Sequence, residues 1–228
     1  MYSIDYLRKN IIKEKWPDST GIGSPAQPYY HGLGCIRLAM QNKTFINFYS
    51  KNLPRLMSTT ERENQLKEIN LRGQFFTENL TPETKFIHTH RENFWSKSLH
   101  GSYKNILYDV NPVDYESEWK LEFINCTPGG WRKVIHDNVG IKEMDFFILQ
   151  EYDEIFHFYN DFHDLELLTD HVITEVRFDF TPPYPKQYRF RIFPKLVLPK
   201  KETQVNALEN YGDPEENWEI ISEILNDI

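Results

Sequence analysis

The sequence predicts a mainly β protein with a helix near each end of the chain. Short segments rich in aromatic and β-branched residues follow one another from residue 85 to residue 198, and turn-forming pairs such as Gly101-Ser102 and Asn160-Asp161 separate them. Phe and Tyr dominate an aromatic content of 15%, which suits strands. Regularly spaced short strands of this kind are typical of a β-sandwich or β-barrel.

The two predicted helices have recognisable start and stop signals. Ser3 suits the N-cap of a helix over residues 3–15, which would end before Pro17. Near the other end, Asp213 suits an N-cap and Pro214 the first helical position, and apolar residues follow at helical spacing. We therefore expect one helix on each side of the β region.

The strands are predicted from alternation and from the turns between them. Residues 33–40 and 44–49 alternate on both sides of a short polar turn, which indicates a β-hairpin. The charged segment 58–72 is compatible with a short helix or with a loop. The further predicted strands are 85–90, 94–100, 103–110, 118–125, 131–136, 144–150, 154–159, 162–168, 172–180 and 187–198.

These elements divide the chain into three parts. Residues 1–30 form an N-terminal helix and loop extension, residues 31–198 a β-barrel, and residues 199–228 a C-terminal helical tail. A length of 228 residues suits one domain with extensions, and a hydrophobic content of 39% is sufficient for a folded core.

Charge and cysteine content narrow the classes of partner. The net charge of −8 gives no electrostatic reason to expect binding to nucleic acid or to an anionic membrane. No apolar run reaches about 18 residues, and the first residues lack the features of a secretion signal. Cys35 and Cys126 are far apart and suit free thiols. We expect a cytoplasmic protein that acts on a small molecule and can form a homodimer.

The most informative motif is His88-Thr89-His90, which ends the apolar-led segment 85–90. Side chains alternate between the faces of a strand, so both imidazoles would project from the same side. Two imidazoles on one face can fill adjacent positions of a metal site. The alternative interpretation is a pair of ordinary histidines on a half-buried strand.

This motif resembles the first metal-binding motif of the cupin superfamily. In that motif a glycine, a His-x-His pair, a glutamate and a second glycine follow one another at set intervals. His88, His90 and Gly101 keep the spacing, whereas Pro82 stands at the first glycine position and Phe94 at the glutamate position. The resemblance implies a cupin-like jelly-roll β-barrel that holds a transition metal without the carboxylate ligand.

A cupin site takes a further histidine from a later strand, and two positions resemble it. His163 lies after a turn and before an extended segment, as the later ligand does in many cupin barrels. His136 follows Pro128-Gly129-Gly130, but three residues later than the motif requires. His88, His90 and His163 are therefore the predicted metal ligands, and His136 is the alternative to His163.

Three neutral imidazoles with open positions favour Fe(II), Zn(II), Ni(II), Cu(II) or Mn(II) over calcium or magnesium. The resemblance implies a non-haem iron oxygenase or dioxygenase acting on a small molecule, so Fe(II) is the preferred cofactor. Two alternatives stay open on the same fold. One is a non-catalytic module that binds a ligand or a protein, and the other is a metal-dependent isomerase or hydrolase.

Substrate contacts are expected from polar side chains on neighbouring strands. Arg177 carries a planar fork that can clamp a carboxylate, and Tyr103 is placed to line the pocket. Arg189 and Arg191 lie on a similar segment, and any of these arginines can instead face solvent. No G-x-S-x-G, P-loop or G-x-G-x-x-G motif occurs.

Overall fold

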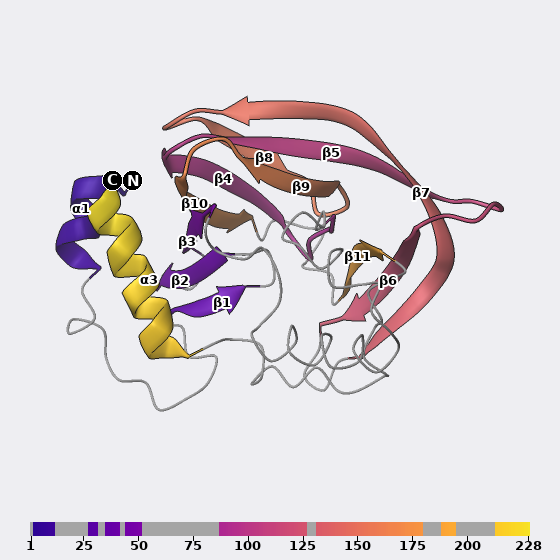
Figure 1. Ribbon diagram of the computed structural model, residues 1–228, viewed down its shortest axis with the longest axis horizontal. Helices are drawn as coiled ribbons and strands as arrows, with labels where there is room; N and C mark the ends of the chain where they lie inside the picture. The colour runs from indigo at the N-terminus through magenta and orange to yellow at the C-terminus, as the bar shows by residue number, and fades with distance from the viewer. Residues whose placement is uncertain are drawn as a thin grey trace, which may run out of the picture.

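The computed structural model describes residues 2–11, 27–31, 35–41, 44–51, 87–126, 131–179, 188–194 and 213–228. Within these ranges the protein is mainly β, as the sequence predicts, with helix α1 (Ile4–Asn10) and helix α3 (Pro214–Asp227) at its ends (Figure 1). Helix α1 ends at Asn10 with Ile11 as its C-cap, so the predicted helix over 3–15 is too long at its C-terminal end. The segment 58–72 lies outside the described residues.

The strands form two antiparallel sheets. The first sheet has the order β1-β2-β3-β10-β4-β8 and the second has the order β11-β6-β7-β5-β9. The strands of the first sheet are β1 (Tyr29–His31), β2 (Cys35–Gln41), β3 (Thr44–Ser50), β10 (His171–Asp179), β4 (Asn93–His100) and β8 (Glu154–His157). Those of the second sheet are β11 (Tyr188–Pro194), β6 (Trp119–Asn125), β7 (Arg132–Leu149), β5 (Tyr103–Pro112) and β9 (Phe162–Leu167).

Most of the predicted strands are confirmed within a few residues. The hairpin of β2 and β3 pairs Gln41 with Thr44 across its turn. Strand β1 begins at Tyr29 and pairs with β2, so the sheet starts inside the segment assigned to the N-terminal extension. The jelly-roll arrangement of the strands stays a prediction.

The two strands predicted at 131–136 and 144–150 are one strand, β7. The polar pair Asp137-Asn138 predicted a turn, yet the strand continues through it. Val139 explains the continuation, because it is fully buried in an apolar cluster and pairs with Pro112 on β5 and Trp119 on β6. Tertiary packing here overrides a local turn signal.

The strand predicted at 85–90 is wrong for its described part. Of residues 87–90, only His88 forms bridges, one to His163 on β9 and one to Arg191 on β11. Strands β9 and β11 are the two edges of the curled second sheet (Figure 1). The segment 87–90 therefore joins these edges, and it is held on both sides by backbone hydrogen bonds.

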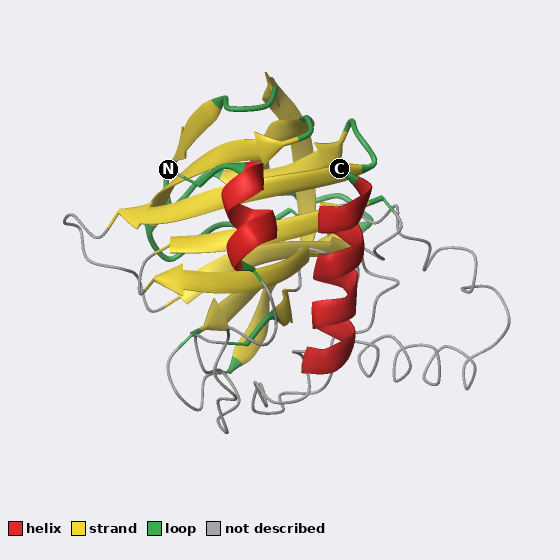
Figure 2. Ribbon diagram, turned by 90° about the vertical axis from the view of Figure 1, so that its left-hand side faces the viewer, coloured by secondary structure: helices red, strands yellow, loops and turns green. Residues whose placement is uncertain are grey.

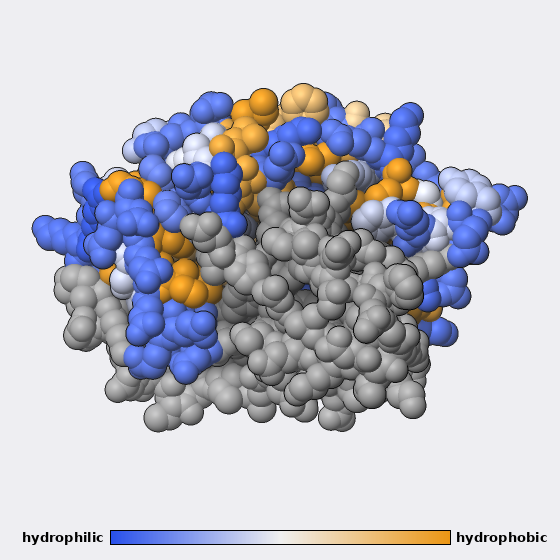
Figure 3. Space-filling model, viewed as in Figure 1, coloured by the Kyte–Doolittle hydropathy of each residue, from blue (hydrophilic) through white to orange (hydrophobic). Residues whose placement is uncertain are grey.

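Helices α1 and α3 lie side by side on the first sheet, on the face away from the second sheet (Figures 1 and 2). Arg8 on α1 donates from Nε to the carbonyl of Leu225 on α3 at 3.0 Å. The apolar side of α3, with Trp218 and Ile221, packs on a buried layer that includes Phe48. The outward side of the helix pair is hydrophilic, and apolar residues show where it meets the sheet (Figure 3). None of the described helices is long and apolar enough to cross a membrane.

The cap of α3 gives a first testable prediction. Asp213 accepts a hydrogen bond from the Glu215 backbone N–H at 2.9 Å, which satisfies one of the free donors of the first turn. Asp213→Ala is expected to lower the free energy of unfolding by about 1 kcal/mol. Urea unfolding measures it, with the exposed mid-helix substitution Glu223→Ala as control. Equal effects of the two substitutions would contradict the capping role.

Two further apolar clusters fix the second sheet. One lies on one face of that sheet, where the curl brings its strands together, and includes Ile87, Ile106, Leu121, Val139 and Ile192. The other lies between the two sheets and includes Cys35, Tyr49, Tyr103, Leu149 and Val172. Beside this second cluster, polar side chains of both sheets face one another.

Candidate metal centre

His88 and His163 come together because they pair directly across the bridge between the segment 87–90 and β9. The N–H of each donates to the carbonyl of the other, at 3.1 and 3.0 Å. Side chains that are directly opposite in an antiparallel pair project from the same face. His90 lies two residues beyond His88 and projects from that face too. The backbone thus brings three imidazoles from two separate segments to one place.

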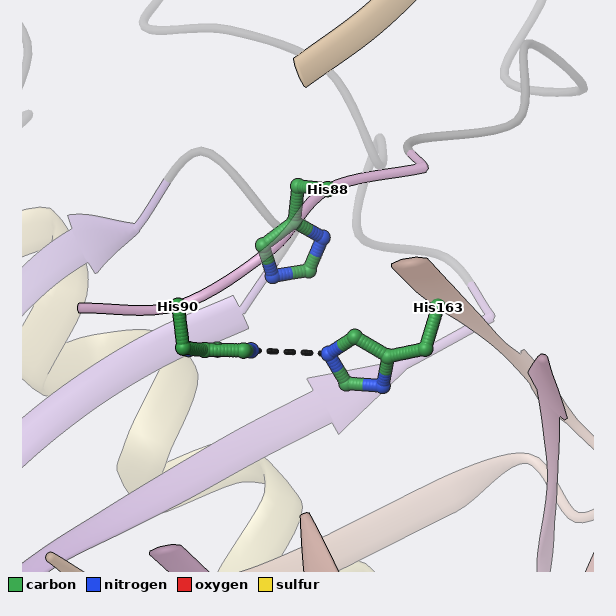
Figure 4. A group of neighbouring side chains, drawn as sticks. All are labelled: His88, His90 and His163. Carbon is green, nitrogen blue, oxygen red and sulfur yellow. Dashed lines mark hydrogen bonds between the residues drawn. The ribbon is translucent and has the colours of Figure 1, made fainter. Parts of the chain in front are cut away.

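The three rings are close enough to share one ion. The Nε2 atoms of His90 and His163 are 2.7 Å apart, and these two rings point toward each other with His88 beside them (Figure 4). The ring centroids are 4.7, 4.8 and 4.9 Å apart. With metal–nitrogen bonds of about 2.1 Å, rings bound at right angles would have centroids about 4.5–5 Å apart. The observed spacing therefore suits a face of three cis ligands.

One atom of each histidine lies within 4.8 Å of the ligand atoms of the other two, so the group can hold a metal ion. No carboxylate among the described residues belongs to it. Glu92, the nearest acidic residue in sequence, lies in a bend of the chain at residues 91–92. This bend interrupts the alternation of side chains after His90. Phe94 packs on the His90 ring with centroids 4.3 Å apart, so the glutamate position of the cupin motif holds an apolar contact.

Asn105 on β5 orients the His163 ring. Its Oδ1 lies 2.9 Å from Nδ1 of His163, a distance at which the ring N–H donates to the amide oxygen. That hydrogen bond places the proton on Nδ1 and leaves the lone pair on Nε2, the atom that faces His90. A hydrogen bond to the distal ring nitrogen is the usual way in which proteins fix a metal-binding imidazole.

Burial keeps the imidazoles of His90 and His163 neutral. Desolvation lowers the pKa of His163 to about 4. The pKa of His90 lies well below its usual value, first because of burial and then because His88, His163 and His157 oppose a further positive charge. Metal binding requires neutral imidazole, so His90 and His163 are in the competent form at neutral pH.

The hydrogen bond from Asn105 gives a second prediction. Asn105→Leu removes the acceptor of the His163 Nδ1 proton and is expected to weaken metal binding by about 10–100-fold. Competition titration with a chromogenic chelator measures the affinity. Asn111→Leu, at an exposed position of the same strand, is the matched control. An unchanged affinity for Asn105→Leu would show that His163 is oriented without it.

A small cavity of about 30 Å³ adjoins the histidine group between the two sheets. His90 and His163 form part of its wall, while His157, Tyr103 and Asn105 add polar groups. Apolar side chains form the rest of the described wall; they include Phe94, Leu165, Val176 and Phe178. The volume is enough for a few water-sized groups beside the candidate metal position.

Tyr103 lines this cavity, where the sequence placed it. Its hydroxyl lies 3.1 Å from Ser96 Oγ, and burial raises its pKa to about 12. The phenol is therefore protonated at neutral pH and offers a hydrogen-bonding group at the cavity wall.

Arg177 lies elsewhere, which corrects its predicted place in the pocket. Thr174, Val176 and Phe178 of β10 face the cavity, and alternation along the strand turns Arg177 to the other face. Its side chain is 46% exposed and pairs with Glu154 and, at 3.9 Å, with Glu175. Of the other two arginines considered, Arg191 pairs with the buried Glu122 at 2.8 Å.

His163 rather than His136 joins the group. His136 is exposed on β7 between exposed neighbours, and it does not belong to the group. His157, which the sequence separated from His163 by a turn, is buried and its ring centroid is 4.6 Å from that of His163. The turn at 158–161 is present, but it carries the chain from β8 in one sheet to β9 in the other, so the two rings contact each other at the cavity wall.

Sequence reasoning missed three residues of this site: Arg37, Asn105 and His157. Arg37 and Asn105 are polar residues within predicted strands. In a strand with one buried face, a polar residue usually faces solvent. In the sequence, these polar residues lie at every second position together with residues that the structure buries. That relation could be recognised only after the packing of the two sheets was known.

Comparisons of the chain with protein-family models, with curated proteins and with solved structures gave no match.

Proposed function

We propose that the protein is a cupin-like metalloprotein in which His88, His90 and His163 hold one divalent transition metal, with Fe(II) preferred. We further propose that it oxygenates a small molecule at this site. The observation that supports this most strongly is the convergence of three buried or half-buried imidazoles beside a small cavity.

The surrounding residues support a reactive site more than a purely structural ion site. A structural zinc site is closed by four protein ligands, whereas the described part of the chain offers three and the group adjoins a cavity. When bound, a transition metal at three neutral ligands supplies Lewis acidity and, in the case of iron, redox chemistry. The chain itself contributes the orientation of His163 by Asn105 and an apolar wall around Phe94.

The choice of oxygenation rests on the resemblance of the His-x-His segment to cupins and on the size of the cavity. A volume of about 30 Å³ accommodates dioxygen or a small polar group, not a large substrate without rearrangement. Zinc-dependent hydrolysis or isomerisation uses the same ligand type, and the sequence alternative of a non-catalytic binding module uses the same fold.

Metal analysis tests the proposal directly. Protein purified without chelators is expected to contain about one transition-metal ion per chain, and iron-loaded protein is expected to consume dioxygen in the presence of a suitable small carboxylate or thiol. Metal-free protein that takes up no ion from Fe(II) or Zn(II) solutions would overturn the proposal. Tight zinc retention with activity under anaerobic conditions would replace oxygenation by hydrolysis or isomerisation.

A further inference from the structure

A row of polar side chains crosses five strands of the first sheet on the face that meets the second sheet. Each residue of the row pairs directly with the next one on the neighbouring strand. From β1 through β2, β3 and β10 to β4, the residues are Tyr29, Arg37, Asn47, Thr174 and Ser98. Residues in such register project from the same face. The same face carries apolar residues on either side of this row, so the row is a polar stripe within a buried surface.

Hydrogen bonds join the row and hold Arg37 in place. Arg37 Nε donates to Asn47 Oδ1 at 2.7 Å, and Asn47 Nδ2 donates to Thr174 Oγ1 at 3.1 Å. On its other side, Arg37 forms a hydrogen bond with the Tyr29 side chain. Arg37, Asn47 and Thr174 all line the cavity that adjoins the histidine group. The guanidinium is thus a fixed part of the cavity wall.

Arg37 forms no ion pair with a carboxylate of the described residues, and Glu92, which interacts with it electrostatically, also faces Arg91 and Arg189. The residue is only 8% exposed, so one carboxylate shared among three arginines leaves its positive charge largely unbalanced. A buried cation is costly unless it is paired and hydrogen-bonded. A guanidinium has five N–H donors, and the neutral acceptors Asn47 and Tyr29 do not neutralise it. An anion in the cavity would.

We propose that this cavity binds a small monocarboxylate, held by Arg37 beside His90 and His163. The inference deepens the proposed function, because it names the class of molecule that the same site would take. A planar guanidinium matches a carboxylate with two parallel hydrogen bonds, and the nearby Phe94, Val176 and Phe178 strengthen that pair by excluding water. The cavity volume restricts the ligand to a molecule of the size of acetate.

Acetate and its neutral analogue acetamide provide the test. Binding of each is measured by calorimetry at constant ionic strength, with metal-loaded and with chelator-treated full-length protein. Acetate is expected to bind and acetamide is not. Arg37→Gln is expected to weaken acetate binding by about ten-fold or more. Arg177→Gln, which removes the same charge from an arginine outside the cavity, is expected to leave it unchanged.

The metal content of each variant separates this inference from the proposed function. Arg37→Gln is expected to bind as much metal as the wild type. Acetate binding that depends on Arg37 in a protein without metal affinity would uphold the inference and overturn the proposed function, whereas metal binding without acetate binding would do the reverse. Acetamide binding equal to acetate binding, or full acetate affinity in Arg37→Gln, would overturn the inference.

Two measurements guard against a misfolded variant. Arg37→Lys keeps the charge without the fork, and is expected to retain more acetate affinity than Arg37→Gln. In the wild type alone, acetate is expected to raise the melting temperature while acetamide at the same concentration is not. Identical melting temperatures with the two additives would overturn the inference without any substitution.

Discussion

His163→Ala is expected to lose the metal that the wild-type protein binds. His163 supplies a ligand atom from β9 and faces His90 at 2.7 Å, so its removal leaves two ligands on one short segment. Loss of a group that merely orients a ligand weakens metal binding about 10–100-fold, so loss of the ligand itself is expected to cost more than about 100-fold. Elemental analysis after dialysis and a chelator competition titration measure this. His88→Ala and His90→Ala are expected to act in the same way.

Two control variants make this result specific. His136→Ala removes an exposed histidine on β7, and His157→Ala removes a buried one that contacts the His163 ring but lies outside the group. Both are expected to retain about one ion per chain. Metal retained in His163→Ala, or lost equally in His157→Ala, would contradict the assignment of the three ligands.

The metal-free protein is expected to lose stability in mild acid. In the folded protein the pKa of His163 is about 4, whereas an unfolded chain gives histidine its usual value near 6.5. Between these values the unfolded state binds a proton that the folded state excludes, so the free energy of unfolding falls as the pH falls from about 6.5 to about 4. From pH 7.5 to about pH 5, His163 alone accounts for about 2 kcal/mol. His90 and His157, whose pKa values are also lowered by burial, add to this loss.

Urea unfolding of chelator-treated protein at pH 7.5 and at about pH 5 measures this loss of stability. In His163→Gln the loss of stability between them is expected to shrink by about 2 kcal/mol, because glutamine does not titrate. His136→Gln, at the exposed position on β7, is expected to keep the wild-type dependence. Stability that is constant between the two pH values would show that water reaches the histidines and that they are not held neutral.

The predictions from local sequence were most reliable where a short pattern carries its own physical reason. Ser3 and Asp213 cap the two helices as expected, because a side-chain oxygen satisfies a backbone N–H within the same turn. The hairpin around residues 42–43 follows from alternation and a polar turn. The strand through Asp137-Asn138 shows the limit of such patterns, since burial of Val139 outweighs the local preference for a turn.

The His-x-His spacing alone determined that His88 and His90 would share a face. The prediction assumed a regular strand, which these residues do not form. Side chains alternate along any extended backbone, and that is sufficient to place both imidazoles on one face. Only the tertiary structure decided that His163 lies opposite His88, since that pairing depends on the segment 87–90 joining β9 to β11.

The chemical character of the cavity was decided by tertiary structure as well. Arg37 and Arg177 are both arginines on predicted strands, and nothing local distinguishes them. One is 8% exposed in the cavity wall, and the other pairs with Glu154 on the outer face. The sequence determines which residues alternate with one another along a strand, because backbone geometry sets that period. Which of the two faces is buried depends on the sheet that packs against it, and residues far apart in the chain supply that sheet.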